Sequence, residues 1–158
     1  MTNSSVLPAY AELCCVSNFT FLKGASRPEE LVQRAKELGY SALAITDECS
    51  LAGIVRAHVA AKESGLALLV GAQFQVQGDA MFTLTVLACN LGGYGNLCEF
   101  ITRLRRASEK GKYFLTRESV QGKDLTNCVV LMSPVRTVSQ EQLLVLGRWA
   151  LLHFTGRC

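Results

Sequence analysis

AITDECSLAG, residues 44–53, leads from an apolar strand through an acidic turn toward a helix. A buried strand that ends at a carboxylate pair, here Asp47 and Glu48, is a usual place for a metal ion or for hydrolytic chemistry. The hydrophobic pattern around this stretch predicts a strand at 42–46 and a helix at 53–64. The stretch therefore predicts an α/β fold with a candidate site where this strand ends.

Strands and helices alternate along the rest of the chain. The sequence SRPE at 26–29 is typical of a capping box that begins a helix at Ser26, and Gly39 is a plausible left-handed stop for that helix. A second capping box is predicted at Ser139. Further strands are expected at 66–70, 82–89 and 127–132, and further helices at 95–107 and from the second capping box through Leu152. This alternation favours βαβ units around a parallel sheet, with the polar segment 108–123 as a surface connection.

The composition limits the class of protein. A chain of 158 residues, 49% of them hydrophobic, suits one domain with a substantial core. No apolar run reaches the roughly 18–20 residues that cross a bilayer, and residues 1–8 lack the features of a signal peptide. We therefore expect a cytoplasmic protein. The formal charge of +3 says little about partners.

The cysteines favour reduced thiols over a disulfide framework or a zinc site. Their number is odd and no CxxC pair occurs among them. They are Cys14, Cys15, Cys49, Cys89, Cys98, Cys128 and Cys158. The adjacent pair at 14 and 15 is expected to occupy a strand, with its side chains on opposite faces.

Four stretches resemble one family. ELCCVSNFTFLKGAS (12–26) is similar to the opening motif of PHP (polymerase and histidinol phosphatase) domains, in which His-x-His-Ser precedes an aromatic-Ser-Phe/Leu-Leu-x-Gly-Ala segment. ITDECSLAG (45–53) resembles the second motif in the form of the error-prone branch of bacterial C-family DNA polymerases, which resemble replicative alpha subunits. LVGAQ (69–73) resembles the Gly-x-Glu strand motif, and LACNLGGYGNLC (87–98) resembles the Gly-Tyr-x-Asn-Leu helix entry. The order and spacing of the four make the resemblance specific.

The resemblance implies a vestigial metal site. The positions that carry ligands in metal-binding members are here Cys14, Val16, Asp47, Glu48 and Gln73. Only Asp47 keeps the family's residue type, and valine offers no donor atom. Cys14, Asp47 and Glu48 stay as candidates for a zinc ion, but we expect no metal and no catalytic residue in this segment. The alternative that we favour is that Asp47 and Glu48 cap the following helix and complement its positive end.

The implied fold is a partial PHP-type distorted (β/α) barrel with alternating strands and helices. Residues 1–158 would form an incomplete PHP domain, with the polymerase palm, fingers and thumb outside this chain. By resemblance the parent is an error-prone DNA-directed DNA polymerase, a nucleotidyltransferase of damage tolerance and translesion synthesis that uses Mg²⁺. The segment itself would be a structural platform that binds no cofactor and lacks catalysis of its own.

The expected partners are the remainder of the polymerase chain, DNA through the parent protein and other damage-tolerance proteins, with no membrane. Arg103, Arg105 and Arg106 could contact nucleic acid, although basic residues at a helix end are more often solvated there. Two further hypotheses stay open. One is a stand-alone metal-dependent PHP phosphoesterase, and the other is a silent interaction module for repair proteins.

Overall fold

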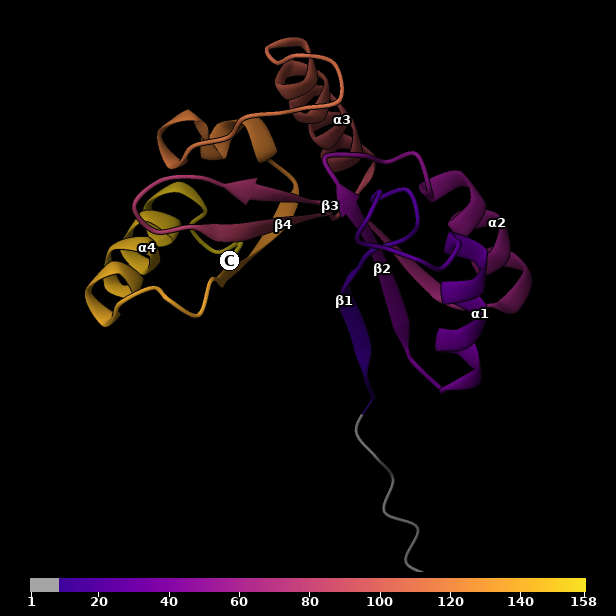
Figure 1. Cartoon of the computed structure of the whole chain (residues 1–158). Helices are drawn as coiled ribbons and strands as arrows, with labels where there is room; N and C mark the ends of the chain where they lie inside the picture. Colours follow the sequence, from indigo (N-terminus) through magenta and orange to yellow (C-terminus); the bar gives the residue numbers. More distant parts are fainter. Residues whose placement is uncertain (1–8) are drawn as a thin grey trace, which may run out of the picture.

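The computed structural model describes residues 9–158, so the prediction about residues 1–8 lies outside the described part. Five strands form one sheet in the order β1-β2-β3-β4-β5 (Figure 1). The strands are β1 (Ala11–Cys15), β2 (Ala42–Glu48), β3 (Ala67–Val76), β4 (Phe82–Ala88) and β5 (Cys128–Pro134). The α-helices are α1 (Pro28–Glu37), α2 (Ile54–Ser64), α3 (Leu91–Arg106) and α4 (Gln140–His153).

The sheet is mixed, and the expectation of a parallel sheet is wrong for its second half. Strands β1, β2 and β3 pair in parallel, whereas β3–β4 and β4–β5 pair antiparallel. Strand β3 runs on to Val76, past the predicted end at residue 70, and only residues 77–81 connect it to β4. A connection this short makes a hairpin, because a parallel crossover needs a dozen or more residues.

The sheet curls into a half-barrel. Cys14 on β1 and Thr85 on β4 are separated by two intervening strands, yet the Sγ of Cys14 lies 3.8 Å from the Oγ1 of Thr85. A flat sheet would keep these strands about 14 Å apart, at roughly 4.8 Å per strand step. The inner face of the curl therefore brings the first strand against the fourth.

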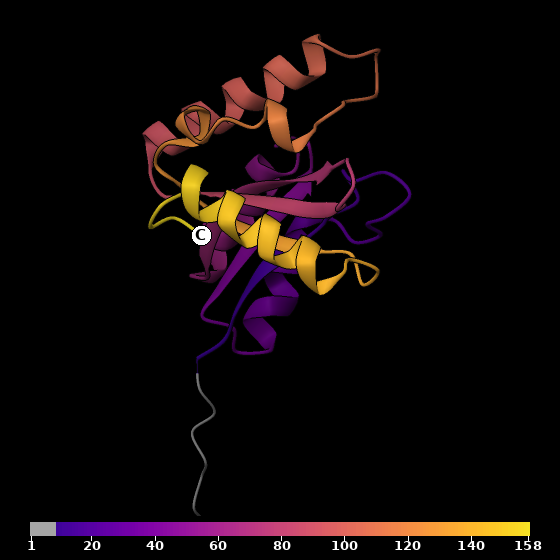
Figure 2. The ribbon, with the colours of Figure 1, turned by 90° about the vertical axis from the view of Figure 1, so that its left-hand side faces the viewer.

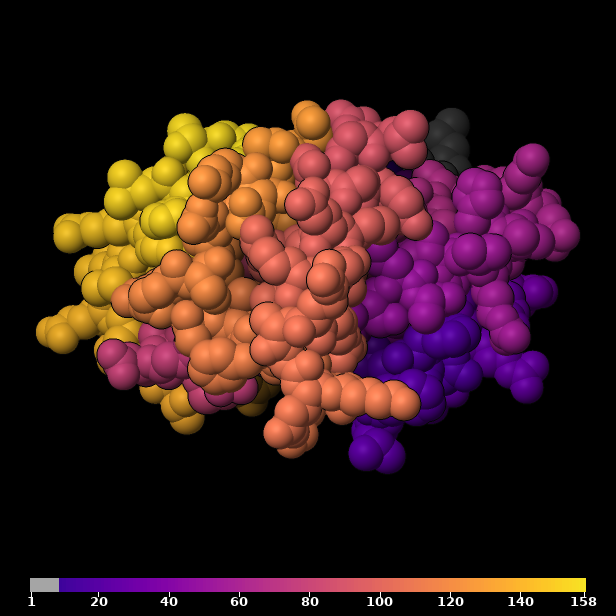
Figure 3. Space-filling model, turned by 90° about the horizontal axis from the view of Figure 1, so that it is seen from above, coloured from indigo at the N-terminus to yellow at the C-terminus, as the bar shows by residue number. Residues whose placement is uncertain are grey.

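The outer face carries two hydrophobic clusters that meet on β3. Leu68 and Val70, early in β3, pack against the cluster formed by β2, α1 and α2. Ala72, Phe74 and Val76, later in the same strand and on the same face, belong to the cluster of β4, β5, α3 and α4. Figure 2 shows α4 crossing the outside of the antiparallel half. Seen from above, the N-terminal half and the α4 half lie at opposite ends, with α3 and the segment that follows it between them (Figure 3).

The capping signals of α1 and α4 are borne out, with a shift of one residue at α1. Helix α1 takes Arg27 as N-cap, one residue later than predicted, and the Arg27 amide donates to Glu30 Oε2 at 2.8 Å. The capping box at Ser139 is confirmed by reciprocal hydrogen bonds with Gln142. Gly39 has the predicted left-handed conformation, with a φ of 74°.

Helix α3 begins at Leu91, four residues before the predicted start, because Asn90 accepts a hydrogen bond from the Gly93 amide as N-cap. Gly93 lets this helix approach the chain before β5 closely, since a Cβ there would lie 2.1 Å from the carbonyl oxygen of Asn127.

The segment 108–123 is more than a polar surface connection. Leu115 and Val120 are each 1% exposed and belong to the larger cluster. Their apolar side chains attach the segment to the core. The sequence did not predict this attachment, because most of the residues around these two are polar. The short 3-10 helices η1 (Arg117–Ser119) and η2 (Gly122–Leu125) lie in and just after this segment.

The seven cysteines are free thiols, as predicted. Cys14 and Cys15 do lie in a strand. No helix within residues 9–158 is both long enough and apolar enough to span a membrane.

Candidate functional site

The candidate site is built on the last two residues of β2. Asp47 is 1% exposed, and both of its carboxylate oxygens are occupied. Oδ1 accepts from the backbone amide of Ser17 and from the hydroxyl of Thr20, each at 2.7 Å, and Oδ2 accepts from the hydroxyl of Ser17 at 2.7 Å. A buried carboxylate needs such donors, because an unpaired charge in the interior is costly. Asp47 therefore anchors the loop that follows β1.

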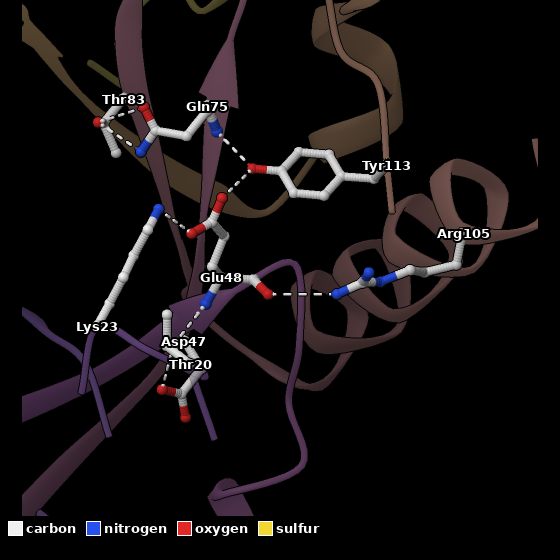
Figure 4. A network of polar contacts seen from close by, with 8 residues as sticks. All are labelled: Thr20, Lys23, Asp47, Glu48, Gln75, Thr83, Arg105 and Tyr113. Atoms are coloured by element: carbon white, nitrogen blue, oxygen red, sulfur yellow. Dashed lines mark hydrogen bonds and ion pairs between the residues drawn. The ribbon is translucent and has the colours of Figure 1, made fainter. Parts of the chain in front are cut away.

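Glu48 points away from Asp47, as neighbouring strand residues must. Its carboxylate forms an ion pair with the ammonium group of Lys23 and accepts from the Tyr113 hydroxyl at 2.8 Å (Figure 4). Its backbone amide donates to Thr20 Oγ1 at 3.0 Å. Thr20 thus donates to one carboxylate and accepts from the backbone of the next residue.

Tyr113 and Arg105 join this strand end to the second half of the molecule. The Tyr113 hydroxyl also accepts from the backbone amide of Gln75 at 2.7 Å. The Arg105 guanidinium donates to the carbonyl oxygen of Cys49 at 3.1 Å and lies over the Tyr113 ring, 5.6 Å from its centroid. These contacts link β2, β3, α3 and the segment after α3 in one network.

Burial governs protonation in this network. It raises the pKa of Tyr113 well above the ordinary phenol value, and the hydrogen bond to Glu48 acts in the same direction. Burial also raises the pKa of the Cys49 thiol to about 11, although the positive charge of Arg105 opposes this. Both groups therefore stay protonated at neutral pH, Tyr113 as a hydrogen-bond donor and Cys49 as a buried thiol.

The donor set does not fit a metal ion. Both Asp47 oxygens point at protein donors, and the Glu48 carboxylate lies between an ammonium group and a phenol. Within residues 9–158 no three His, Cys, Asp or Glu side chains gather closely enough to hold a cation. A Zn²⁺ site needs about four donors in tetrahedral geometry.

The predicted ligand positions are spread over three strands and a loop. Cys14 is exposed on β1, and Val16 follows that strand. Gln73 pairs with Glu48 across the β2–β3 ladder and with Thr85 across the β3–β4 ladder. The structure thus places these positions around one end of the half-barrel without joining their side chains as ligands.

Capping of the following helix is the wrong explanation for the acidic pair. Helix α2 has Gly53 as its N-cap, and no side chain caps it. Asp47 does lie beside this helix end, because a Cβ on Gly53 would come 3.0 Å from Asp47 Oδ2. Its negative charge therefore complements the α2 dipole, while its hydrogen bonds go to the loop after β1.

The three arginines considered for nucleic-acid contact have different surroundings. Arg105 is held by backbone carbonyls, and Arg103 forms an ion pair with Asp124. Among the described residues, Arg106 forms no hydrogen bond or ion pair. Of the three arginines, Arg106 is therefore the one whose guanidinium is available for another partner within the described part of the chain.

Sequence reasoning missed Ser17, Thr20, Lys23 and Tyr113 as members of this network. The first three lie inside the opening motif at 12–26, in which the resemblance points only to the ligand positions Cys14 and Val16. Tyr113 is 65 residues from Glu48, and no sequence signal joins the two.

The fold and this strand-end site define the class of the protein. The PHP domain family model matches residues 12–140, so the chain belongs to the PHP domain family. Its similarity to error-prone DNA polymerases is equally clear. It is 47% identical to the error-prone DNA polymerase of Bordetella parapertussis over 98% of this chain, and 50% identical to that of Dechloromonas aromatica over 96%. The family resemblance drawn from the four motifs is confirmed.

The chain spans only a small part of these relatives, 16% of the Bordetella protein and 14% of the Dechloromonas protein. Among solved structures, a chain from Bifidobacterium adolescentis described as a metal-dependent phosphoesterase matches with a TM-score of 0.66. That match has 18% identity and covers 90% of this chain and 75% of the other, so it bears on the fold alone. The expected partial PHP-type barrel is confirmed.

Proposed function

We propose that this chain is the PHP portion of an error-prone DNA polymerase and acts there as a structural platform without catalysis of its own. The identity to error-prone polymerases of 47–50% over nearly the whole chain supports the first part. The parent would be a nucleotidyltransferase that extends DNA past lesions in the cytoplasm, with Mg²⁺ held by residues outside this chain.

One observation carries the structural role. Asp47, the only residue that keeps the ligand type of metal-binding members, accepts three hydrogen bonds from Ser17 and Thr20. A carboxylate that is satisfied by protein donors in this way has no need of a cation. The network around it ties the loop after β1 to β2, which is what a platform requires.

Metal analysis and hydrolysis assays test the absence of catalysis. The purified chain is dialysed against Zn²⁺ or Mn²⁺ and assayed for bound metal and for hydrolysis of phosphate esters. We expect substoichiometric metal and no turnover above that of an Asp47→Ala variant. Stoichiometric metal with turnover that this variant abolishes would instead support a phosphoesterase.

A domain exchange tests the polymerase role. In the Dechloromonas aromatica polymerase, the segment that matches this chain is replaced by the chain itself, and primer extension is measured with Mg²⁺ on intact and lesion-containing templates. We expect the chimera to extend primers on both templates. A polymerase from which the segment has been deleted should be inactive or unstable. An inactive chimera would contradict the assignment.

A further inference from the structure

Helix α4 is apolar on the side that faces away from the core as well as on the side that faces it. Its inner side is formed by Leu146, Trp149 and Ala150, which are all buried. Its outer side exposes Leu144 by 60%, Leu151 by 65% and Leu152 by 80%. Arg148 is the one charged residue among these leucines, and Glu141 lies in the first turn, so the outer side is mostly apolar. Exposed apolar side chains gathered in this way mark a surface that is normally covered.

The exposed side chains continue into a groove. Val145 and Leu152 line a hollow of about 540 Å³ between α4 and η1, together with Trp149 and Arg148. Next to it, Val145 borders a second hollow of about 570 Å³, which reaches the residues that connect β3 to β4. Both hollows are also lined by Arg117 and Glu118, so the exposed leucines and Val145 form an apolar ridge beside a groove of mixed polarity.

The other helices do not share this property. The outer side of α1 is charged, with Glu30, Arg34 and Glu37 exposed. At the end of α3 the outer side carries arginines. Helix α2 exposes one pair of neighbouring valines, Val55 and Val59, next to charged residues. Scattered exposed apolar residues are ordinary, whereas a continuous patch marks an interface.

We infer that the outer side of α4 is the surface on which the rest of the polymerase polypeptide docks. This inference rests on the proposed function. The occupant is an apolar face of the same polypeptide, because the chain spans only about one-sixth of the length of its polymerase relatives and the remainder must pack against it. Figure 2 shows this side of α4 with no other element of the chain over it.

The test uses the chimeric polymerase and two matched pairs of substitutions. Leu144→Glu with Leu151→Glu places two charges on the proposed interface. Val55→Glu with Val59→Glu places two charges on α2, at valines that are 74% and 52% exposed. Each pair is made in the chimera and in the isolated chain. The readouts are the rate of cleavage by a protease at low concentration, primer extension and denaturant unfolding.

We expect the α4 pair to raise the cleavage rate of the chimera by at least about tenfold, because an unpaired charge buried at an interface shifts the docking equilibrium by more than that factor. The same pair should leave the unfolding midpoint of the isolated chain unchanged, and the α2 pair should change neither protein. If the chimera is active and the α4 pair changes neither its cleavage rate nor its primer extension, the inference about the docking surface is wrong. The proposed function is then unaffected.

Two other results would also overturn the inference. If the chimera with unsubstituted α4 is inactive, the proposed function fails and the docking surface fails with it. If the isolated chain forms a dimer that the α4 pair separates, the occupant is a second copy of the chain. Sedimentation of the isolated chain at several concentrations distinguishes that case.

Discussion

The Thr20 hydroxyl donates to the Asp47 carboxylate at 2.7 Å and accepts from the Glu48 amide at 3.0 Å, so one side chain fastens the loop after β1 to the end of β2. Both partners are protein groups, the buried carboxylate at the end of the strand and the backbone amide of the next residue. Loop and strand are therefore held together by donors and acceptors that the chain supplies itself.

Replacing Asp47 tests this attachment. Asp47→Ala leaves the buried Ser17 and Thr20 donors without their acceptor, so we expect the free energy of unfolding to fall by about 3–4 kcal/mol. Asp47→Asn keeps one acceptor oxygen and should cost roughly half as much. Chemical denaturation measures both. An Asp47→Ala protein as stable as the parent would refute the anchoring role.

Tyr113 should stabilise the protein through its hydroxyl. Tyr113→Phe keeps the ring but leaves the Gln75 amide without a partner and the Glu48 carboxylate with only its ion pair to Lys23, which we expect to cost about 1–2 kcal/mol. The control is Tyr10→Phe, whose hydroxyl binds Glu12 at an exposed position. Equal unfolding midpoints for the two variants would contradict the prediction.

Stability should fall in alkaline solution. Burial raises the pKa of Cys49 and Cys128 from 9.0 to about 11, and it raises that of Tyr113 as well. Below pH 9 the thiols are protonated in both states and their contribution is complete. As the pH rises from 9 to 11 the unfolded chain loses these protons first, so stability drops by roughly 1–2 kcal/mol for each thiol.

Denaturant unfolding at pH 7.5, 9 and 10.5 measures this slope. Cys49→Ala with Cys128→Ala should make it shallower, even though the double variant starts from a lower stability. A slope that is unchanged by the two substitutions would show that other groups cause it.

Two glycines should respond in opposite directions to alanine. A Cβ on Gly122 would lie 1.7 Å from the carbonyl oxygen of His153, so Gly122→Ala must displace backbone and should cost at least about 2 kcal/mol. Gly147 lies within α4 with open space around it, so Gly147→Ala should add roughly 0.5–1 kcal/mol through helix propensity. Thermal unfolding of both variants checks the two signs together.

The arginines of α3 should separate into structural and surface groups. Arg105→Gln removes the bonds to the Cys49 carbonyl oxygen and should lower stability by about 1–2 kcal/mol, whereas Arg106→Gln should not change it. Anisotropy of a labelled single-stranded oligonucleotide then tests for nucleic-acid contact. If such contact exists, Arg106→Gln should weaken it most strongly at low salt.

Local patterns predicted the elements better than their arrangement. Strand β2 and helix α4 follow from a short apolar run and a capping box, because their signals lie within the elements themselves. The switch to antiparallel pairing after β3 follows from the length of β3, which leaves only a short connection to β4. That length was missed because Gln73 and Gln75 interrupt the apolar run, so the strand was predicted to end before them. The network at Glu48 depends on Tyr113, which only the folded chain brings near.

Strand β3 serves both hydrophobic clusters with one face, Leu68 and Val70 toward one and Phe74 toward the other. Among the described strands it is the one that belongs to both halves of the sheet, and the contacts of Tyr113 and Arg105 reinforce the same junction. A substitution that disrupts this strand should therefore weaken the attachment between the two halves. The halves would then unfold at different denaturant concentrations instead of in one transition.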